Sequence, residues 1–229
     1  MPNIIDVSEA LLKILPIIYV VDISDYRNLK CISRLNKTMR ETISIFKRYY
    51  GDCDYDIRIN VLSNASEGKW MYNELQPANK FEWKEMCMSS ESDPGSLLEE
   101  LNKQLSRSEM LKSDAGFCLP YVVFISDRKH TPSLALNEII ENITTTNKWF
   151  KHSHKIAIAL NDEVNSDYLL QLSKNPETIV SFVNIQEVHE ILFYSPNLDK
   201  DRLITYMKNL SISKSSQESV EDENWGDWE

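Results

Sequence analysis

The sequence predicts one α/β domain with a mostly parallel central sheet and helices on both of its faces. Two almost wholly apolar runs, residues 14–21 and 121–126, are typical of central strands that are covered on both faces. Further strand-length runs alternate with helix-length amphipathic segments, which is the order of a parallel sheet. With 229 residues, of which 42% are hydrophobic, the chain is long enough for a single sizeable core.

The first half of the chain shows both kinds of periodicity. After the apolar strand, residues 29–49 carry one apolar stripe at helical spacing. Residues 55–63 alternate strictly, which predicts a strand with one better-protected face, and residues 70–72 predict a short strand beside it. Residues 77–92 are irregular, with Phe81 and Trp83 as apolar anchors.

The second half continues the alternation to the end of the expected domain. We expect helices over residues 95–106, 132–150, 166–173, 185–193 and 199–210, and strands over residues 121–126, 155–160 and 178–183. A proline at position 132 is placed as in a first helical turn. The domain is expected to span residues 14–212, after an N-terminal segment of residues 1–13, and residues 213–229 read as a disordered acidic tail.

Composition limits the classes of partner. A formal net charge of −10 argues against nucleic acid and anionic membrane as main partners. The four cysteines lie far apart without metal-finger spacing, and neither a signal peptide nor a membrane-spanning run is recognisable. We therefore expect a cytoplasmic protein.

Oxygen-bearing side chains follow the two most apolar strands. Asp22 ends the first strand and Asp127 ends the strand over residues 121–126, while Ser92 and Asp93 stand directly before a helix. The carboxyl ends of parallel strands meet at one edge of a sheet, where ligands bind in such folds. Converging carboxylates and hydroxyls suit Mg²⁺ or Mn²⁺, although single aspartates at these places also cap helices.

These segments resemble the metal-ion-dependent adhesion site of von Willebrand factor A domains. Asp22-Ile23-Ser24-Asp25-Tyr26 is similar to the Asp-x-Ser-x-Ser motif, residues 92–97 (SDPGSL) to the threonine segment, and Asp127 to the last aspartate. Lys112-Ser113-Asp114 further resembles a linker of the bacterial tellurium-resistance-associated, TerY-like group. The resemblance implies a Rossmann-like fold, protein–protein interaction, and a divalent ion held by Asp22, Ser24, Ser92 and Asp127. It also implies a stress-response setting with kinase- or phosphatase-like partners.

Two departures from that motif point to a degenerate site. Tyr26 stands where the family has its second coordinating serine, and a phenol oxygen lies too far from the backbone to replace it. Arg128 replaces the glycine after the last aspartate, and its cation could pair with Asp22 or Asp127 in place of a metal. We therefore expect a metal-free, partner-binding surface, formed by Asp25, Tyr26, Asp93, Arg128 and Lys129.

Trp225 and Trp228 interrupt the otherwise acidic tail, so the tail is either a solubilising end or a short binding motif with aromatic anchors. Two other functions stay open at this point. One is a Mg²⁺-dependent phosphotransfer protein of receiver type, with Asp127 as acceptor. The other is a structural subunit attached through its tail. The favoured hypothesis is a non-catalytic interaction module.

Overall fold

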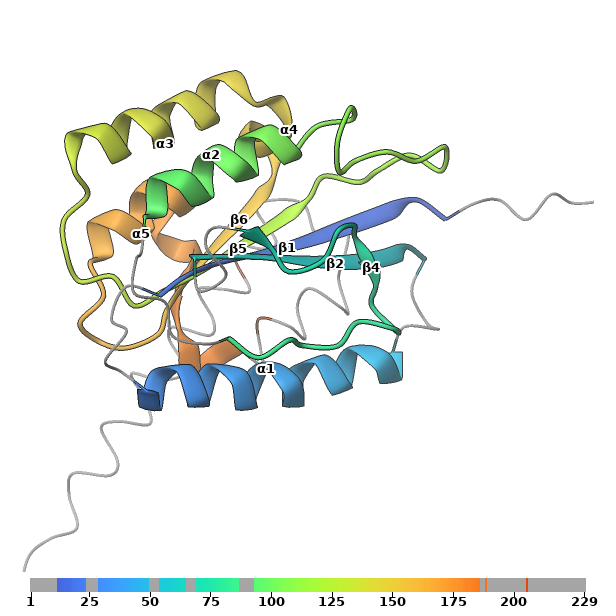
Figure 1. Ribbon diagram of the computed structural model, residues 1–229, viewed down its shortest axis with the longest axis horizontal. Helices are drawn as coiled ribbons and strands as arrows, with labels where there is room; N and C mark the ends of the chain where they lie inside the picture. Colours follow the sequence, from blue (N-terminus) through green and yellow to red (C-terminus); the bar gives the residue numbers. More distant parts are fainter. Residues whose placement is uncertain are drawn as a thin grey trace, which may run out of the picture.

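The computed structural model describes residues 12–23, 29–49, 54–64, 69–86 and 93–185, together with Val188 and Thr205. Of the helices expected over residues 185–193 and 199–210, only Ile185, Val188 and Thr205 are described, and the tail lies outside these ranges. Figure 1 shows one sheet between two layers of helices, so the expected α/β class is confirmed. None of the helices in the described ranges is long and apolar enough to cross a membrane.

The sheet has seven strands in the order β3-β2-β1-β5-β6-β7, with β4 also paired to β2. Strands β1 (Ile14–Asp22), β2 (Asp56–Ser63), β5 (Tyr121–Ser126), β6 (His154–Ala159) and β7 (Ile179–Ser181) are parallel. The short strands β3 (Lys69–Trp70) and β4 (Gln76–Pro77) run antiparallel to β2. Strand order therefore reverses between β1 and β5.

The two central strands are buried on both faces, as their apolar runs predict. Every residue of β1 and β5 is buried. Ile17, Tyr19 and Val21 pack in the layer of α1 (Leu29–Tyr49), whereas Ile18 and Val20 pack toward the opposite helices. Those helices are α2 (Pro94–Gln104), α3 (Leu134–Thr146), α4 (Lys148–His152) and α5 (Ser166–Ser173).

Two expected elements are shorter or divided. The helix expected over residues 132–150 begins only at Leu134, because Ser133 adopts an extended conformation and caps the Leu136 amide. It is also broken at Asn147, whose extended backbone ends α3 and whose side chain caps Phe150 at the start of α4. The strand expected over residues 178–183 is reduced to β7, since residues 182–184 form a 3₁₀ turn.

The start of α2 shows why glycine follows proline there. Asp93 caps the helix by accepting hydrogen bonds from the amides of Gly95 (3.0 Å) and Ser96 (3.2 Å). A Cβ atom on Gly95 would lie 3.0 Å from Ile139 Cδ1, closer than side chains normally pack. Glycine therefore lets α2 and α3 approach each other over the sheet.

Candidate functional site

The candidate site lies where the carboxyl ends of β1 and β5 meet, at the reversal of strand order. Asp22 pairs with Ser126 across the two strands, and the Asp127 amide donates to the Asp22 carbonyl over 3.3 Å. Ligand sites in open α/β sheets form at this kind of switch point. The structure thus brings together the two aspartates that are 105 positions apart in the chain (127 − 22).

The Asp22 carboxylate is buried and accepts hydrogen bonds from three further elements. Its side chain is 5% exposed. Oδ1 accepts from Asn64 Nδ2, after β2, at 2.7 Å, and Oδ2 accepts from the Tyr168 hydroxyl on α5 at 3.0 Å. The Ser126 hydroxyl donates to Oδ2 over 3.5 Å. Strand ends and a helix therefore converge on one carboxylate.

Arg128 supplies the positive charge at this carboxylate. Its Nε lies 2.9 Å from Asp22 Oδ2 and its Nη2 lies 3.3 Å from Oδ1, so the guanidinium contacts both oxygens. The Arg128 side chain is 14% exposed. The ion pair is therefore largely removed from water. Removing only one of its two partners would leave an unpaired buried charge, which is costly.

Local contacts hold the guanidinium in place. The Arg128 amide donates to the Ser126 hydroxyl (3.1 Å), and its carbonyl accepts from the amide of Asn165 (2.8 Å), the residue that caps α5. The guanidinium carbon lies 5.9 Å from the centre of the Tyr168 ring. The loop after β5 and the start of α5 are thus joined around one side chain.

The charges of the cluster are mutually dependent. Burial alone would lower the pKa of Arg128, but the hydrogen bond and charge of Asp22 outweigh it and the pKa is raised. The negative charge of Asp127 acts in the same direction. Burial, and next the charge of Asp22, raise the pKa of the Tyr168 phenol well above its usual value. Tyr168 therefore stays a hydrogen-bond donor throughout the neutral range.

Asn64 links the end of β2 to the end of β1. Its Oδ1 accepts from the Ile23 amide at 3.0 Å, and its Nδ2 donates to the Ile23 carbonyl (3.2 Å) as well as to Asp22. Asn64 is buried, with 2% exposed. This residue fixes the direction in which the chain leaves β1.

The described residues at Asp22 do not fit a divalent cation. Both carboxylate oxygens already accept hydrogen bonds from protein donors, and the Arg128 guanidinium contacts both of them. A dication there would have to displace Arg128 and face its charge. Among the described residues, no group of three or more His, Cys, Asp or Glu side chains could hold a metal ion.

The other residues predicted for the site fall into two groups. Asp127 is fully buried at 0% exposed, Lys129 forms an ion pair with Glu163 in the loop before α5, and Asp93 caps α2. The remaining predicted residues lie outside the described ranges; they are Ser24, Asp25, Tyr26, Ser92, Trp225 and Trp228.

Sequence reasoning did not select three side chains that complete the cluster. Asn64 and Ser126 each stand at a strand end next to Asp22, so the strand-end argument that selected the aspartates would have found them too. Tyr168 is 146 positions from Asp22. Helical periodicity places it on the buried side of α5 and carries no signal about the carboxylate.

Comparison with solved structures shows which fold the domain has. The chain resembles a von Willebrand factor type A protein from Catenulispora acidiphila, with a TM-score of 0.53 and 9% identity over 79% of this chain and 42% of that one. The fold is that of a von Willebrand factor A domain. No protein-family model and no curated protein matches the sequence.

Two other solved structures with a von Willebrand factor A-like fold are also similar to this chain. Proximal thread matrix protein 1 from the mussel byssus, with a zinc-occupied MIDAS motif (the metal-ion-dependent adhesion site), gives a TM-score of 0.51 at 13% identity, covering 80% of this chain and 48% of that one. The pilus adhesin SpaC from Lactobacillus rhamnosus GG gives a TM-score of 0.51 at 8% identity, covering 88% and 30%. The chain spans less than half the length of each of these structures. Metal binding therefore occurs in one neighbour with this fold.

Proposed function

We propose that this von Willebrand factor A domain is a non-catalytic module that docks a partner protein at the carboxyl edge of its sheet without a metal ion. The observation that carries the proposal is the saturation of Asp22 by Asn64, Arg128 and Tyr168. In this proposal Arg128 takes the place of the ion, and the adhesion site is degenerate. The surface is set in shape before a partner arrives, which lowers the entropic cost of binding.

Exposed side chains that follow β5 and β7 at the same edge of the sheet supply contacts for a partner. Lys129 is 41% exposed at its side chain, and its ion-pair partner Glu163 is 68% exposed. Leu134, at the start of α3, is 83% exposed, and Val183, just after β7, is 51% exposed. Charged and apolar side chains at one edge are the mixture found in protein interfaces, where charge steers the encounter and apolar burial stabilises the complex.

The class of partner follows from the resemblance and not from the geometry. The similarity of residues 112–114 to the TerY-like linker supports a bacterial stress-response or tellurium-resistance-type system with a kinase- or phosphatase-like partner. We therefore propose such a partner and a cytoplasmic location for this protein.

Site-specific crosslinking tests the docking edge. A photoreactive phenylalanine analogue replaces Leu134 in one variant and Leu119 in its control, because Leu119 is 44% exposed but precedes β5 at the opposite edge. In extract from the source cell, we expect position 134 to crosslink one protein that position 119 does not. Lys129→Glu should reduce that product. Equal products from both positions would remove the carboxyl edge from the proposal.

Truncation after Leu210 separates this function from attachment through the tail. The truncated chain lacks Trp225 and Trp228. We expect it to keep the crosslink at position 134, since the proposed surface belongs to the folded domain. Loss of the product would instead favour a structural subunit held by its tail.

Two features favour binding over receiver-like phosphotransfer. Asp127, the only candidate acceptor that the sequence suggested, is 0% exposed, and β6 is followed by Leu160, Asn161 and Asp162 where such a mechanism needs a lysine. Incubation with acetyl phosphate and Mg²⁺, followed by mass measurement, is expected to give no added phosphate. A phosphorylated Asp127 would overturn the non-catalytic proposal.

A further inference from the structure

A cavity of about 310 Å³ lies at the amino edge of the sheet, at the other end of β1 from Asp22. Ile14, the first residue of β1, lines it, whereas Asp22 is the last residue of that strand. Nine residues of strand span roughly 30 Å. The cavity is therefore separate from the proposed docking edge, and its volume is at the lower end of the range of about 300–1,000 Å³ for small-molecule sites.

Backbone hydrogen bonds build the walls of this cavity from three segments. Residues 104–111 are folded into a turn by amide-to-carbonyl bonds from Met110 to Gln104 (3.1 Å) and from Leu111 to Ser106 (2.9 Å). Residues 116–118 pair with the start of β1 through the carbonyl of Gly116 and the amide of Cys118. The third segment, residues 73–75, directly precedes β4, which is held in place by its pairing with β2. These walls form a site with a defined shape.

Apolar side chains from all three segments and β1 form one part of the lining; they are Ile14, Leu75, Met110 and Phe117. Ile14 and Leu75 are buried, at 2% and 5% exposed. A small apolar group placed against them would be removed from water, which is favourable by about 25 cal/mol per Å² of apolar surface.

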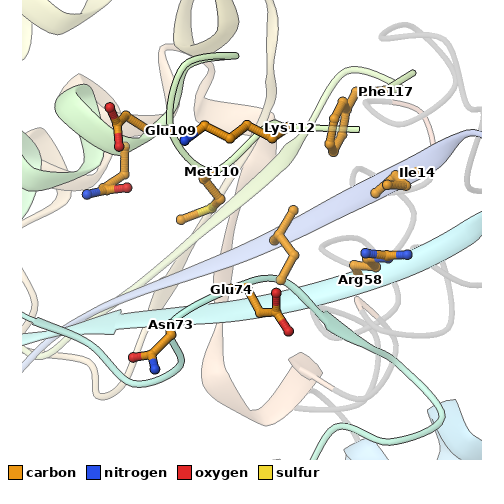
Figure 2. Close-up of a pocket in the computed structure, with 10 residues that line it drawn as sticks. Ile14, Arg58, Asn73, Glu74, Glu109, Met110, Lys112 and Phe117 are labelled. Atoms are coloured by element: carbon orange, nitrogen blue, oxygen red, sulfur yellow. The ribbon is translucent and has the colours of Figure 1, made fainter. Parts of the chain in front are cut away.

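Two cations and two anions surround this apolar lining. Figure 2 shows Glu109 and Lys112 on one side of the cavity and Arg58 and Glu74 on the other. Each side therefore presents one charge of each sign, from segments that are far apart in the sequence. The lining as a whole is close to neutral, which disfavours a ligand of high net charge such as a nucleotide.

Most of these charges are not used inside the protein. Within the described ranges, Glu74, Glu109 and Lys112 form no ion pair. Arg58 uses its Nε (2.8 Å) and Nη2 (2.7 Å) on the same oxygen of Asp56, and its Nη1 has no hydrogen-bond partner among the described residues. The cavity thus offers both a cation for a carboxylate and a carboxylate for an ammonium group.

We propose that this cavity binds a small zwitterion with an apolar side chain, namely an apolar amino acid or an apolar dipeptide. The ligand carboxylate contacts Lys112 or the Nη1 side of Arg58, the ligand ammonium contacts Glu109 or Glu74, and the side chain packs on Ile14, Leu75 and Phe117. A monocarboxylic acid would pair only with the cations of the cavity, and a simple amine only with the carboxylates. In either complex the remaining charged side chains would lose water without gaining a partner.

Titration calorimetry on the full chain tests this with L-leucine and with leucyl-leucine, which distinguish the free amino acid from the dipeptide. The probes 4-methylpentanoate and isoamylamine each lack one charge of leucine. We expect binding of at least one zwitterion, with each single-charge probe weaker by about tenfold or more. Absence of heat from both zwitterions at about 1 mM, or equal binding of the single-charge probes, would overturn the proposal.

Variants at exposed positions keep the test independent of folding. Lys112→Met and Glu109→Gln should each weaken binding of the zwitterion by about tenfold. Lys103→Met is the control, because Lys103 lies on α2 with its side chain 70% exposed and does not line the cavity. Unchanged binding in both cavity variants, or equal weakening in the control, would contradict the assignment. None of these results depends on partner docking at the opposite edge.

Discussion

The two ends of strand β1 handle charge in opposite ways. At its carboxyl end, Asp22 is buried and meets Arg128, Asn64 and Tyr168. At its amino end, charged groups line a cavity, and several of them have no ion-pair partner among the described residues. The first end contributes to the stability and shape of the domain, while the second keeps its charges available for a ligand. Substitutions at the two ends should therefore differ in kind.

The largest expected effect is on stability at the carboxyl end. Asp22→Ala leaves the buried guanidinium of Arg128 without its counter-ion, so the free energy of unfolding should fall by about 3–5 kcal/mol. Glu109→Gln, at the cavity, should change it by less than about 0.5 kcal/mol. Urea denaturation measures both. A loss below about 1 kcal/mol for Asp22→Ala would show that the cluster is not a stabilising unit.

A smaller effect is expected for single hydroxyl groups. Tyr168→Phe removes a hydrogen bond to a charged carboxylate and should cost about 1.5–3 kcal/mol in the same measurement. Tyr121→Phe is the matched control, because the Tyr121 hydroxyl is buried with no hydrogen-bond partner in the described part of the chain. The control should be neutral or stabilising. Equal destabilisation by both substitutions would assign the effect to packing and not to Asp22.

Alkaline pH should weaken the domain through the same tyrosines. Burial raises the pKa of Tyr121 to about 12, and burial and Asp22 raise that of Tyr168. Above pH 10 the unfolded chain releases these protons first, so stability is complete below about pH 10 and falls as pH rises, by up to about 1.4 kcal/mol per pH unit for each tyrosine. Tyr168→Phe should make the slope of stability against pH less steep, because unfolding then releases one proton fewer. An unchanged slope in denaturation experiments between pH 9 and 11 would contradict this.

The sequence predicted the sheet far better than it predicted the contacts of the site. Strands β1 and β5 were found because burial on both faces leaves an unbroken apolar run. The division between α3 and α4 was missed, since the Asn147 cap depends on local backbone geometry within a region that is helical on both sides. Tyr168 was missed because nothing in local periodicity reports which distant group a buried phenol will contact.

The sequence also did not determine which aspartate Arg128 contacts. The sequence placed a cation beside two aspartates and left open which of them it would pair with. In the structure it contacts both oxygens of Asp22, while the charge of Asp127 adds to the field. Strand register decides this, because Asp22 faces Ser126 across the sheet, and register could not be derived from the sequence.

The most direct test of the account is the thermal midpoint of unfolding in EDTA and in Mg²⁺ or Mn²⁺. An ion at 100 times its dissociation constant would stabilise the fold by about 2.7 kcal/mol. We expect no change in the midpoint for the natural chain, because Arg128 occupies the position at Asp22, and a Mn²⁺-dependent rise only in Arg128→Gly. A rise of several degrees in the natural chain that is lost in Asp22→Asn would contradict the claim that Arg128 replaces the metal.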